Sequence, residues 1–225
     1  MIYITGDTHI PIDIHKLSVT NFPEQRQLCK DDTLIICGDF GGVWNQSNEE
    51  KYWLDWLEDK TFTTIFVDGN HENFDLLKSY PVEREFGGRV HRIRESIFHV
   101  LRGEVITLEG KKFFCMGGAT SQDKQFRKEG RDWWPDEMPS QEEYVSAVTN
   151  LKANNWSVDY VITHCAPTKT QKKIAEHYKH DNLNSFLQHI VDDDLEYDHW
   201  FFGHYHIDEM IDEKHTAVYQ NIIPL

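Results

Sequence analysis

Long apolar runs and runs of basic residues are both missing from this sequence of 225 residues. No apolar segment approaches the roughly 20 residues that a membrane-spanning helix needs, so we expect no membrane segment. The formal net charge is -15. Because nucleic-acid affinity depends on neutralising many phosphates, we do not expect the chain to bind extended nucleic acid. A small phosphate site remains compatible with this charge, since bound cations can invert the local field.

Cysteine is also scarce, and occurs at Cys29, Cys37, Cys115 and Cys165. No two of them have C-x-x-C spacing, which argues against a zinc ribbon. So few cysteines in a chain of this length do not indicate a disulfide scaffold, and we expect a reduced, intracellular protein. The start, MIYITGDTHI, has neither the basic region nor the long apolar run of a signal peptide. These features together predict a cytoplasmic location.

Linkers rich in Pro, Gly or Ser are absent, and so are internal repeats. A single hydrophobic core commonly grows to this chain length before it splits. Hydrophobic residues make up 39% of the sequence, which is enough for a large core. We therefore predict a single domain over residues 1–225.

The apolar runs that are present are short, rich in β-branched residues, and end at Gly, His or Asp. Their continuous hydrophobicity predicts strands that are covered on both faces. The predicted strands are Met1–Thr5, Asp32–Gly38, Thr63–Gly69, Glu104–Glu109, Lys111–Gly118, Val158–His164, His199–His204 and Thr216–Ile223. The fourth and fifth of these are joined across Gly110 and predict a hairpin, so we expect mixed sheets.

Helical patterns lie between these strands. Apolar residues recur on one helical face in Glu49–Lys60. Ser140 and Glu143 have capping-box spacing at the start of a second helix over residues 139–154. A third, shorter helix is predicted at Leu183–Asp193. Strands that alternate with helices predict an α/β layered domain.

Polar residues with ligand chemistry stand at the ends of the predicted strands. They are Asp7, His9, Asp39, Asn70, His71, His164, His204 and His206. In layered α/β folds the carboxyl ends of strands form a common ligand-binding edge, so these side chains can converge. Imidazole, carboxylate and amide donors without thiolate suit Mn, Fe, Zn or Mg. There are more donors than one ion with an open position needs, which favours two ions that share a carboxylate.

Five short motifs occur in a fixed order between Gly6 and His206, namely GDTH, GDFGG, GNHE, TH and GHYH. This pattern resembles the calcineurin-like metallophosphoesterases. The resemblance implies their four-layer αββα sandwich, with two mixed β-sheets and a metal site at the carboxyl ends of strands. The strand pattern by itself does not separate that architecture from a single-sheet α/β fold.

The resemblance also implies two divalent metal ions, with Mn expected and Fe, Zn or Mg as alternatives. Carried over by position, the ligands are Asp7, His9 and His206 for the first ion, Asn70, His164 and His204 for the second, and Asp39 for both. In this scheme a bridging hydroxide attacks phosphorus in line. The catalytic residues would be Asp39, Asn70, which steadies developing charge, and His71, which protonates the leaving group.

The sequence departs from the protein Ser/Thr phosphatases of this superfamily after its second motif. Gly42 and Val43 occupy the positions where those enzymes carry an Asp and an Arg. The Asp would orient the catalytic histidine and the Arg would bind phosphate. We therefore expect a small phosphorylated substrate, a phosphodiester or nucleotide in preference to a phosphoprotein, and the partner of His71 stays open.

A substitute phosphate-binding group is expected in residues 117–140, which read GGATSQDKQFRKEGRDWWPDEMPS. We predict substrate contacts from Lys124, Arg127 and Arg131. The adjacent Trp133 and Trp134 allow two interpretations, because they could stack on a base or fix the loop to the core.

The favoured function is therefore a dinuclear metal-dependent phosphoesterase. Two alternatives remain open at this point. One is a nuclease that acts on DNA or RNA ends, which the negative charge disfavours. The other is a non-catalytic scaffold of the same fold, which the complete set of ligand positions disfavours.

Overall fold

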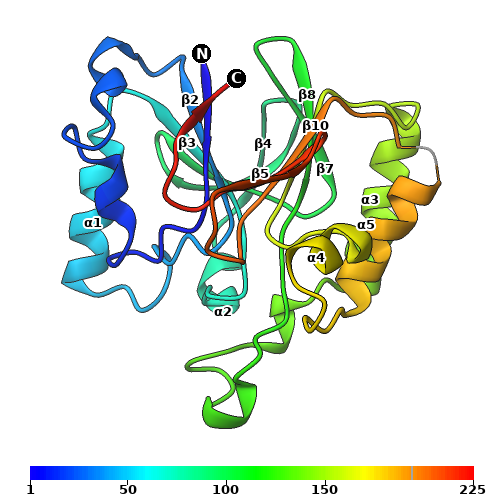
Figure 1. The fold of residues 1–225 in the computed structure, drawn as a ribbon. Helices are drawn as coiled ribbons and strands as arrows, with labels where there is room; N and C mark the ends of the chain where they lie inside the picture. Colours follow the sequence, from blue (N-terminus) through cyan, green and yellow to red (C-terminus); the bar gives the residue numbers. More distant parts are fainter. Residues whose placement is uncertain (194) are drawn as a thin grey trace.

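The computed structural model describes residues 1–193 and 195–225. Two mixed β-sheets pack face to face, and helices cover the outer face of each sheet (Figure 1). This is the four-layer αββα arrangement implied by the resemblance. The alternative of a single sheet is wrong.

The first sheet has seven strands in the order β13-β1-β2-β3-β6-β5-β4. Its parallel centre consists of β1 (Ile2–Thr5), β2 (Thr33–Cys37), β3 (Thr63–Val67) and β6 (Ile97–Val100). The antiparallel strands at its edges are β5 (Gly88–Arg94), β4 (Val82–Glu85) and β13 (Ile223–Pro224). We refer to it below as the seven-stranded sheet.

The second sheet has six strands in the order β11-β12-β10-β9-β8-β7. Its parallel strands are β8 (Lys111–Met116), β9 (Tyr160–Thr163), β10 (His199–Phe202) and β12 (His215–Ala217). The antiparallel edges are β7 (Glu104–Leu108) and β11 (Glu209–Asp212). The antiparallel pairing of β7 with β8 confirms the predicted hairpin.

The predicted helices correspond to α1 (Asn48–Glu58), α3 (Gln141–Ala153) and α5 (Asn182–Asp192). The capping box of α3 is present, because Ser140 accepts from the Glu143 N–H and the Glu143 side chain accepts from the Ser140 N–H. Two short helices, α2 (Phe74–Leu77) and α4 (Thr168–Ile174), follow β3 and β9. Figure 1 shows α1 outside the seven-stranded sheet and α3 and α5 outside the other.

The hydrophobic core is divided by the layers. Leu54 of α1 packs in one cluster with Leu34 of the seven-stranded sheet. Ile35 and Phe113 belong to the cluster between the two sheets. Leu187 of α5 lies in the cluster on the outer face of the six-stranded sheet. The central strands are therefore covered on both faces, which accounts for their continuous hydrophobicity.

The predicted strand over Thr216–Ile223 is wrong. The strand ends at Ala217, and the chain turns and crosses to the other sheet before β13 begins at Ile223. The carboxylate of Asp208 holds this turn, because it accepts from the backbone N–H groups of residues 219, 220 and 221. A continuous apolar stretch therefore serves two sheets, which hydrophobicity alone does not show.

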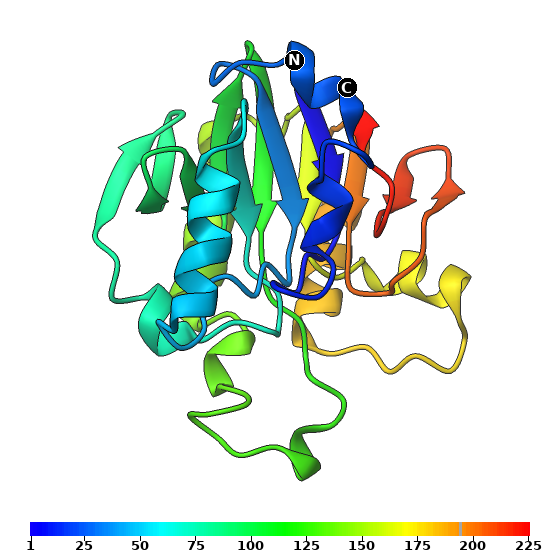
Figure 2. The same cartoon turned by 90° about the vertical axis from the view of Figure 1, so that its left-hand side faces the viewer.

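No helix within the described residues is long and apolar enough to cross a membrane. The carboxyl ends of the parallel strands lie together at one end of the molecule, opposite the two chain termini (Figure 1). The long segment of residues 117–138 projects from this same end in both views (Figure 2).

Candidate metal centre

The predicted ligands meet at the carboxyl ends of parallel strands from both sheets. The seven-stranded sheet contributes the residues after β1, β2 and β3, and the six-stranded sheet those after β9 and β10. Three groups of side chains have potential donor atoms within 4.8 Å of one another: Asp7, His9 and His206; His9, Asp39 and His71; and Asp7, Asp39 and His164. The site thus lies between the two sheets.

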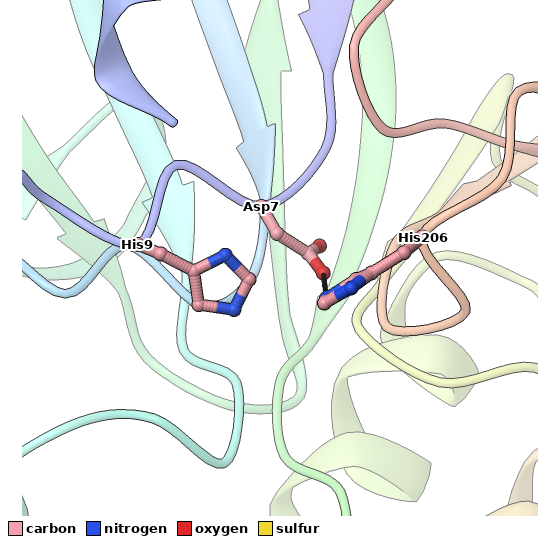
Figure 3. A group of neighbouring side chains, drawn as sticks. All are labelled: Asp7, His9 and His206. Carbon is pink, nitrogen blue, oxygen red and sulfur yellow. Dashed lines mark ion pairs between the residues drawn. The ribbon is translucent and has the colours of Figure 1, made fainter. Parts of the chain in front are cut away.

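The first group consists of Asp7, His9 and His206 (Figure 3). The Nε2 atom of His206 lies 3.1 Å from Asp7 Oδ2. The rings of His9 and His206 approach edge to face, with 5.1 Å between their centroids. Residues nearly 200 positions apart in the chain are therefore brought together because β1 and β10 lie in facing sheets.

Asp39 occupies the centre of the site. Its Oδ2 atom lies 3.1 Å from His9 Nε2, and its Oδ1 atom lies 3.3 Å from His164 Nε2. One carboxylate thus presents an oxygen to a histidine on each side. This arrangement is compatible with a ligand shared by two ions.

Asn70 and His204 lie beside His164. The Oδ1 atom of Asn70 is 3.3 Å from His164 Nε2, and the His204 ring centroid is 4.9 Å from that of His164. The amide nitrogen of Asn70 donates to Ser121 Oγ at 3.2 Å. Because this bond uses the NH2 group, the amide oxygen remains turned toward the other ligands.

Hydrogen bonds fix which nitrogen two of the histidines present. His164 Nδ1 donates to the carbonyl oxygen of Cys37 at 2.9 Å, which leaves Nε2 with its lone pair for a metal. His9 Nδ1 lies 2.9 Å from Asp13 Oδ2, the carboxylate–imidazole pairing that accompanies many metal ligands. Sequence reasoning missed Asp13, and the only signal for it was a carboxylate four residues after a predicted ligand.

The backbone is unusual at four of the predicted ligands. His9, Asp39, His204 and His206 have φ angles of 35°, 43°, 68° and 51°. Residues other than glycine rarely adopt this left-handed region, and each such residue costs on the order of 1 kcal/mol or more. The surrounding fold therefore holds these ligand positions against a local preference.

The glycines of the motifs allow the ligand loops to approach one another. A Cβ atom on Gly69 would lie 2.0 Å from Asp39 Oδ1, and one on Gly203 would lie 2.1 Å from Asp7 Oδ1. No side chain fits at such distances. The glycines of Gly-Asn-His and Gly-His-Tyr-His are therefore required by the packing of the site, beside the predicted ligands of the same motifs.

Two buried carboxylates dominate the electrostatics. Asp7 and Asp39 are 0% and 1% exposed, and within the described residues their ion pairs are all with histidines. Burial favours the neutral form of Asp39, but the attraction of His164 and His9 holds its pKa well below the usual range. Buried carboxylates surrounded by imidazoles, without thiolate, fit divalent cations of the Mn, Fe, Zn or Mg type.

The histidines differ in their affinity for protons. Burial lowers the pKa of His204 to about 4, so this ligand is neutral near pH 7. Burial also opposes protonation of His164, but Asp39 and Asp7 raise its pKa to about 10. Because a metal needs the neutral imidazole, metal binding at His164 would displace a proton.

His71 lies at the edge of the site beside Arg127. Its backbone N–H donates to Asp39 Oδ1 at 2.8 Å, and its Nδ1 atom is 3.2 Å from the Arg127 guanidinium. Burial lowers the pKa of His71, and the nearby Arg127 acts in the same direction against the attraction of Asp39. Arg127 thus contacts His71, whose partner the sequence left open. His71 also has donor atoms within reach of His9 and Asp39, so the geometry permits a ligand role as well.

The structure brings only one of the three predicted substrate-binding residues into contact with this site. Arg127 touches His71, as described. Lys124 instead pairs with the buried Glu137, and Arg131 pairs with Asp132 while its side chain stays 69% exposed. Trp134 is 4% exposed, and its Nε1–H donates to Asp75 at 2.8 Å. Of the two interpretations of the tryptophans, Trp134 supports the one in which the loop is fixed to the core.

The geometry agrees with the comparison to known families. The sequence profile described as calcineurin-like phosphoesterase matches residues 1–208. No curated protein matches the chain.

Proposed function

Because this chain belongs to the calcineurin-like phosphoesterases, we propose that it hydrolyses phosphate esters with two divalent metal ions held between its sheets. The observation that supports two ions most directly is the position of Asp39. Its carboxylate oxygens face His9 Nε2 on one side and His164 Nε2 on the other. Mn is the ion that we expect in the cell.

Each predicted ligand has a defined part in this proposal. Asp7, His9 and His206 would hold the first ion, Asn70, His164 and His204 the second, and Asp39 both. The bound ions would supply Lewis acidity toward the phosphoryl oxygens and a nucleophile derived from water near neutral pH. The protein's own task is to orient these donors, and the hydrogen bonds of His164 and Asn70 support that role.

His71 and Arg127 would act on the substrate. His71 has an imidazole at the edge of the ligand set, where it could hold a proton for the leaving-group oxygen. The guanidinium of Arg127 offers parallel N–H donors that match two oxygens of one phosphoryl group. Its contact with His71 supports a common position for the two groups on the substrate.

The proposed substrate is a small phosphodiester or nucleotide. Gly42 and Val43 replace the Asp and Arg of the protein phosphatases, which disfavours a phosphoprotein. Arg127 is the one predicted substrate-binding cation at the site, because Lys124 is already paired within its own loop. The site therefore suits a compact anion. The net charge of -15 disfavours extended nucleic acid.

A comparison of p-nitrophenyl phosphate with bis-p-nitrophenyl phosphate, using Mn-loaded protein, tests this proposal. We expect hydrolysis of both, with the diester preferred, and turnover at background for Asp39→Asn. A preference for the monoester would replace the diester proposal with a phosphatase. Hydrolysis of neither compound, by protein shown to hold Mn, would contradict the proposed activity on simple esters.

A further inference from the structure

The turn between β12 and β13 reaches the first ligand group from outside the region that the family profile matches. The profile covers residues 1–208, whereas this turn comprises residues 218–222. Its second residue is Tyr219, which is partly buried. Nothing in the motifs of the sequence pointed to this segment.

Tyr219 contacts one ligand histidine directly and a second through a carboxylate. Its ring stacks on the imidazole of His206, with centroids 4.6 Å apart and planes inclined by 9°. Its hydroxyl donates to Asp13 Oδ1 at 3.2 Å. The other oxygen of Asp13 lies 2.9 Å from His9 Nδ1. Both histidines of the first group, drawn in Figure 3, are therefore linked to this one tyrosine.

The turn itself is firmly held. Asp208 accepts from the backbone N–H of Tyr219 at 2.8 Å and from the next two N–H groups at 3.0 Å each. Thr5 Oγ1 donates to the carbonyl of Asn221 at 2.9 Å. The buried Lys16 donates to the carbonyl oxygens of both Tyr219 and Asp7. The backbone of the tyrosine is thus tied to the backbone of a predicted ligand.

His206 is a residue whose ring a neighbour can help to hold in place. Its side chain is 50% exposed, and its backbone lies in the left-handed region. An exposed imidazole loses rotational freedom when it binds a metal, and a ring already held in place loses less. A stacked tyrosine restricts the tilt of the His206 ring, while Asp13 restricts the ring of His9 and its tautomer.

We propose that Tyr219 is a positioning residue for the first metal ion, acting on His206 by stacking and on His9 through Asp13. The inference rests on the proposed function only insofar as Asp7, His9 and His206 are taken as metal ligands. It makes the C-terminal turn part of the metal site.

Direct measurement of Mn binding, by calorimetry and by electron paramagnetic resonance, tests this inference without any substrate. We expect two bound ions in the wild type. Tyr219→Leu removes both the stack and the hydroxyl. It should lower the affinity for one of the two ions by roughly 10- to 100-fold. Tyr219→Phe keeps the stack and should lower the affinity for the same ion by a smaller factor. The second ion should bind with unchanged affinity in both variants.

Tyr52→Leu is a matched control, because Tyr52 is 60% exposed on α1 and its ring contacts Trp53 instead of the site. It should bind both ions like the wild type. Unchanged binding of both ions by Tyr219→Leu would overturn the inference and leave the proposed function intact. An equal loss of affinity for both ions, with a lowered Tm, would also overturn it, because the role of Tyr219 would then be structural. A wild type that binds no Mn would overturn the proposed function itself.

Discussion

Single residues decide which atom each ligand presents to the site. The carbonyl of Cys37 accepts a hydrogen bond from His164 Nδ1–H, and the hydroxyl of Ser121 accepts one from the Asn70 amide. In both cases the contact leaves the predicted metal-binding atom turned inward. Such partners commonly change metal affinity or activity by 10- to 100-fold when they are removed, so they matter almost as much as the ligands.

His71→Ala should separate acid catalysis from metal binding. If His71 only protonates the leaving group, the variant should bind two Mn ions normally and lose turnover by roughly 10²- to 10⁴-fold. Calorimetric Mn titration beside measurement of kcat checks both parts. Loss of one ion would show that His71 is a ligand, as its reach toward His9 and Asp39 permits.

Arg127→Ala should raise KM and leave the Mn affinity nearly unchanged. The guanidinium faces His71 and contacts no predicted metal ligand directly. We expect kcat/KM to fall about 10-fold or more, which corresponds to the loss of one charge-assisted contact. Arg127→Lys should restore little, since a lysine cannot match two oxygens at once. Arg131→Ala is the control and should behave like the wild type, because the ion pair of Arg131 within the described residues is with Asp132. Equal effects of the two alanine variants would remove Arg127 from the site.

The candidate ligands could be predicted from the sequence because each follows a strand in a short local motif. Asp13, Ser121 and Tyr219 could not, because their contacts with the ligands depend on how loops pack in three dimensions. The same holds for Lys124, whose charge indicated a substrate contact. Its actual partner, Glu137, is a buried carboxylate thirteen residues further along.

At the scale of elements, most of the apolar strands and the helices with clear caps were predictable, whereas β4, β5, β6 and β11 were not. β5 contains His91 and three arginines, which obscure the apolar pattern of a strand in the sequence. In the sheet, His91 stands opposite His99 of β6, and their Nδ1 atoms are 3.1 Å apart. His99 in turn contacts the buried Asp68. Cross-strand hydrogen bonds thus satisfy polar residues that, in the sequence alone, argued against a strand.

This pair makes stability depend on pH. Burial and the neighbouring His99 lower the pKa of His91 to about 4, below its usual value near 6.5. Protons therefore bind the unfolded chain more readily. The associated stability is present above pH 6.5 and is lost as pH falls toward 4. Urea denaturation between pH 7 and pH 4.5 should show a falling midpoint, and His91→Phe should have a flatter profile. An unchanged slope in the variant would assign the effect to other groups.

At the scale of the whole molecule, the candidate metal site lies where the two sheets meet. Asp7, Asp39 and Asn70 follow strands of one sheet, and His164 and His204 follow strands of the other. An ion bound by ligands from both should stabilise their packing, because it binds the folded chain and has no such site on the unfolded one.

Mn should therefore raise the Tm of the wild type, and chelation should lower it. At a concentration of about 100 times Kd, one ion contributes about 2.7 kcal/mol. Scanning calorimetry across a range of Mn concentrations gives the shift directly. Asp39→Asn should lose most of this dependence, since Asp39 is proposed to contact both ions. A wild-type Tm that does not change with Mn concentration would contradict a metal site between the sheets.

The path of the chain also sets the order in which the site can be completed. Strands β1 to β6 all belong to the seven-stranded sheet, and the chain then enters the six-stranded sheet at β7. On a ribosome, Asp7, Asp39 and Asn70 therefore emerge long before His164, His204 and His206. The nascent half-protein carries Asp7, Asp39 and Asn70 with His9 as its one predicted histidine ligand, and a sheet with one bare apolar face. We therefore expect the proposed metal site to be completed late in synthesis, when Tyr219 emerges after the other residues of the site.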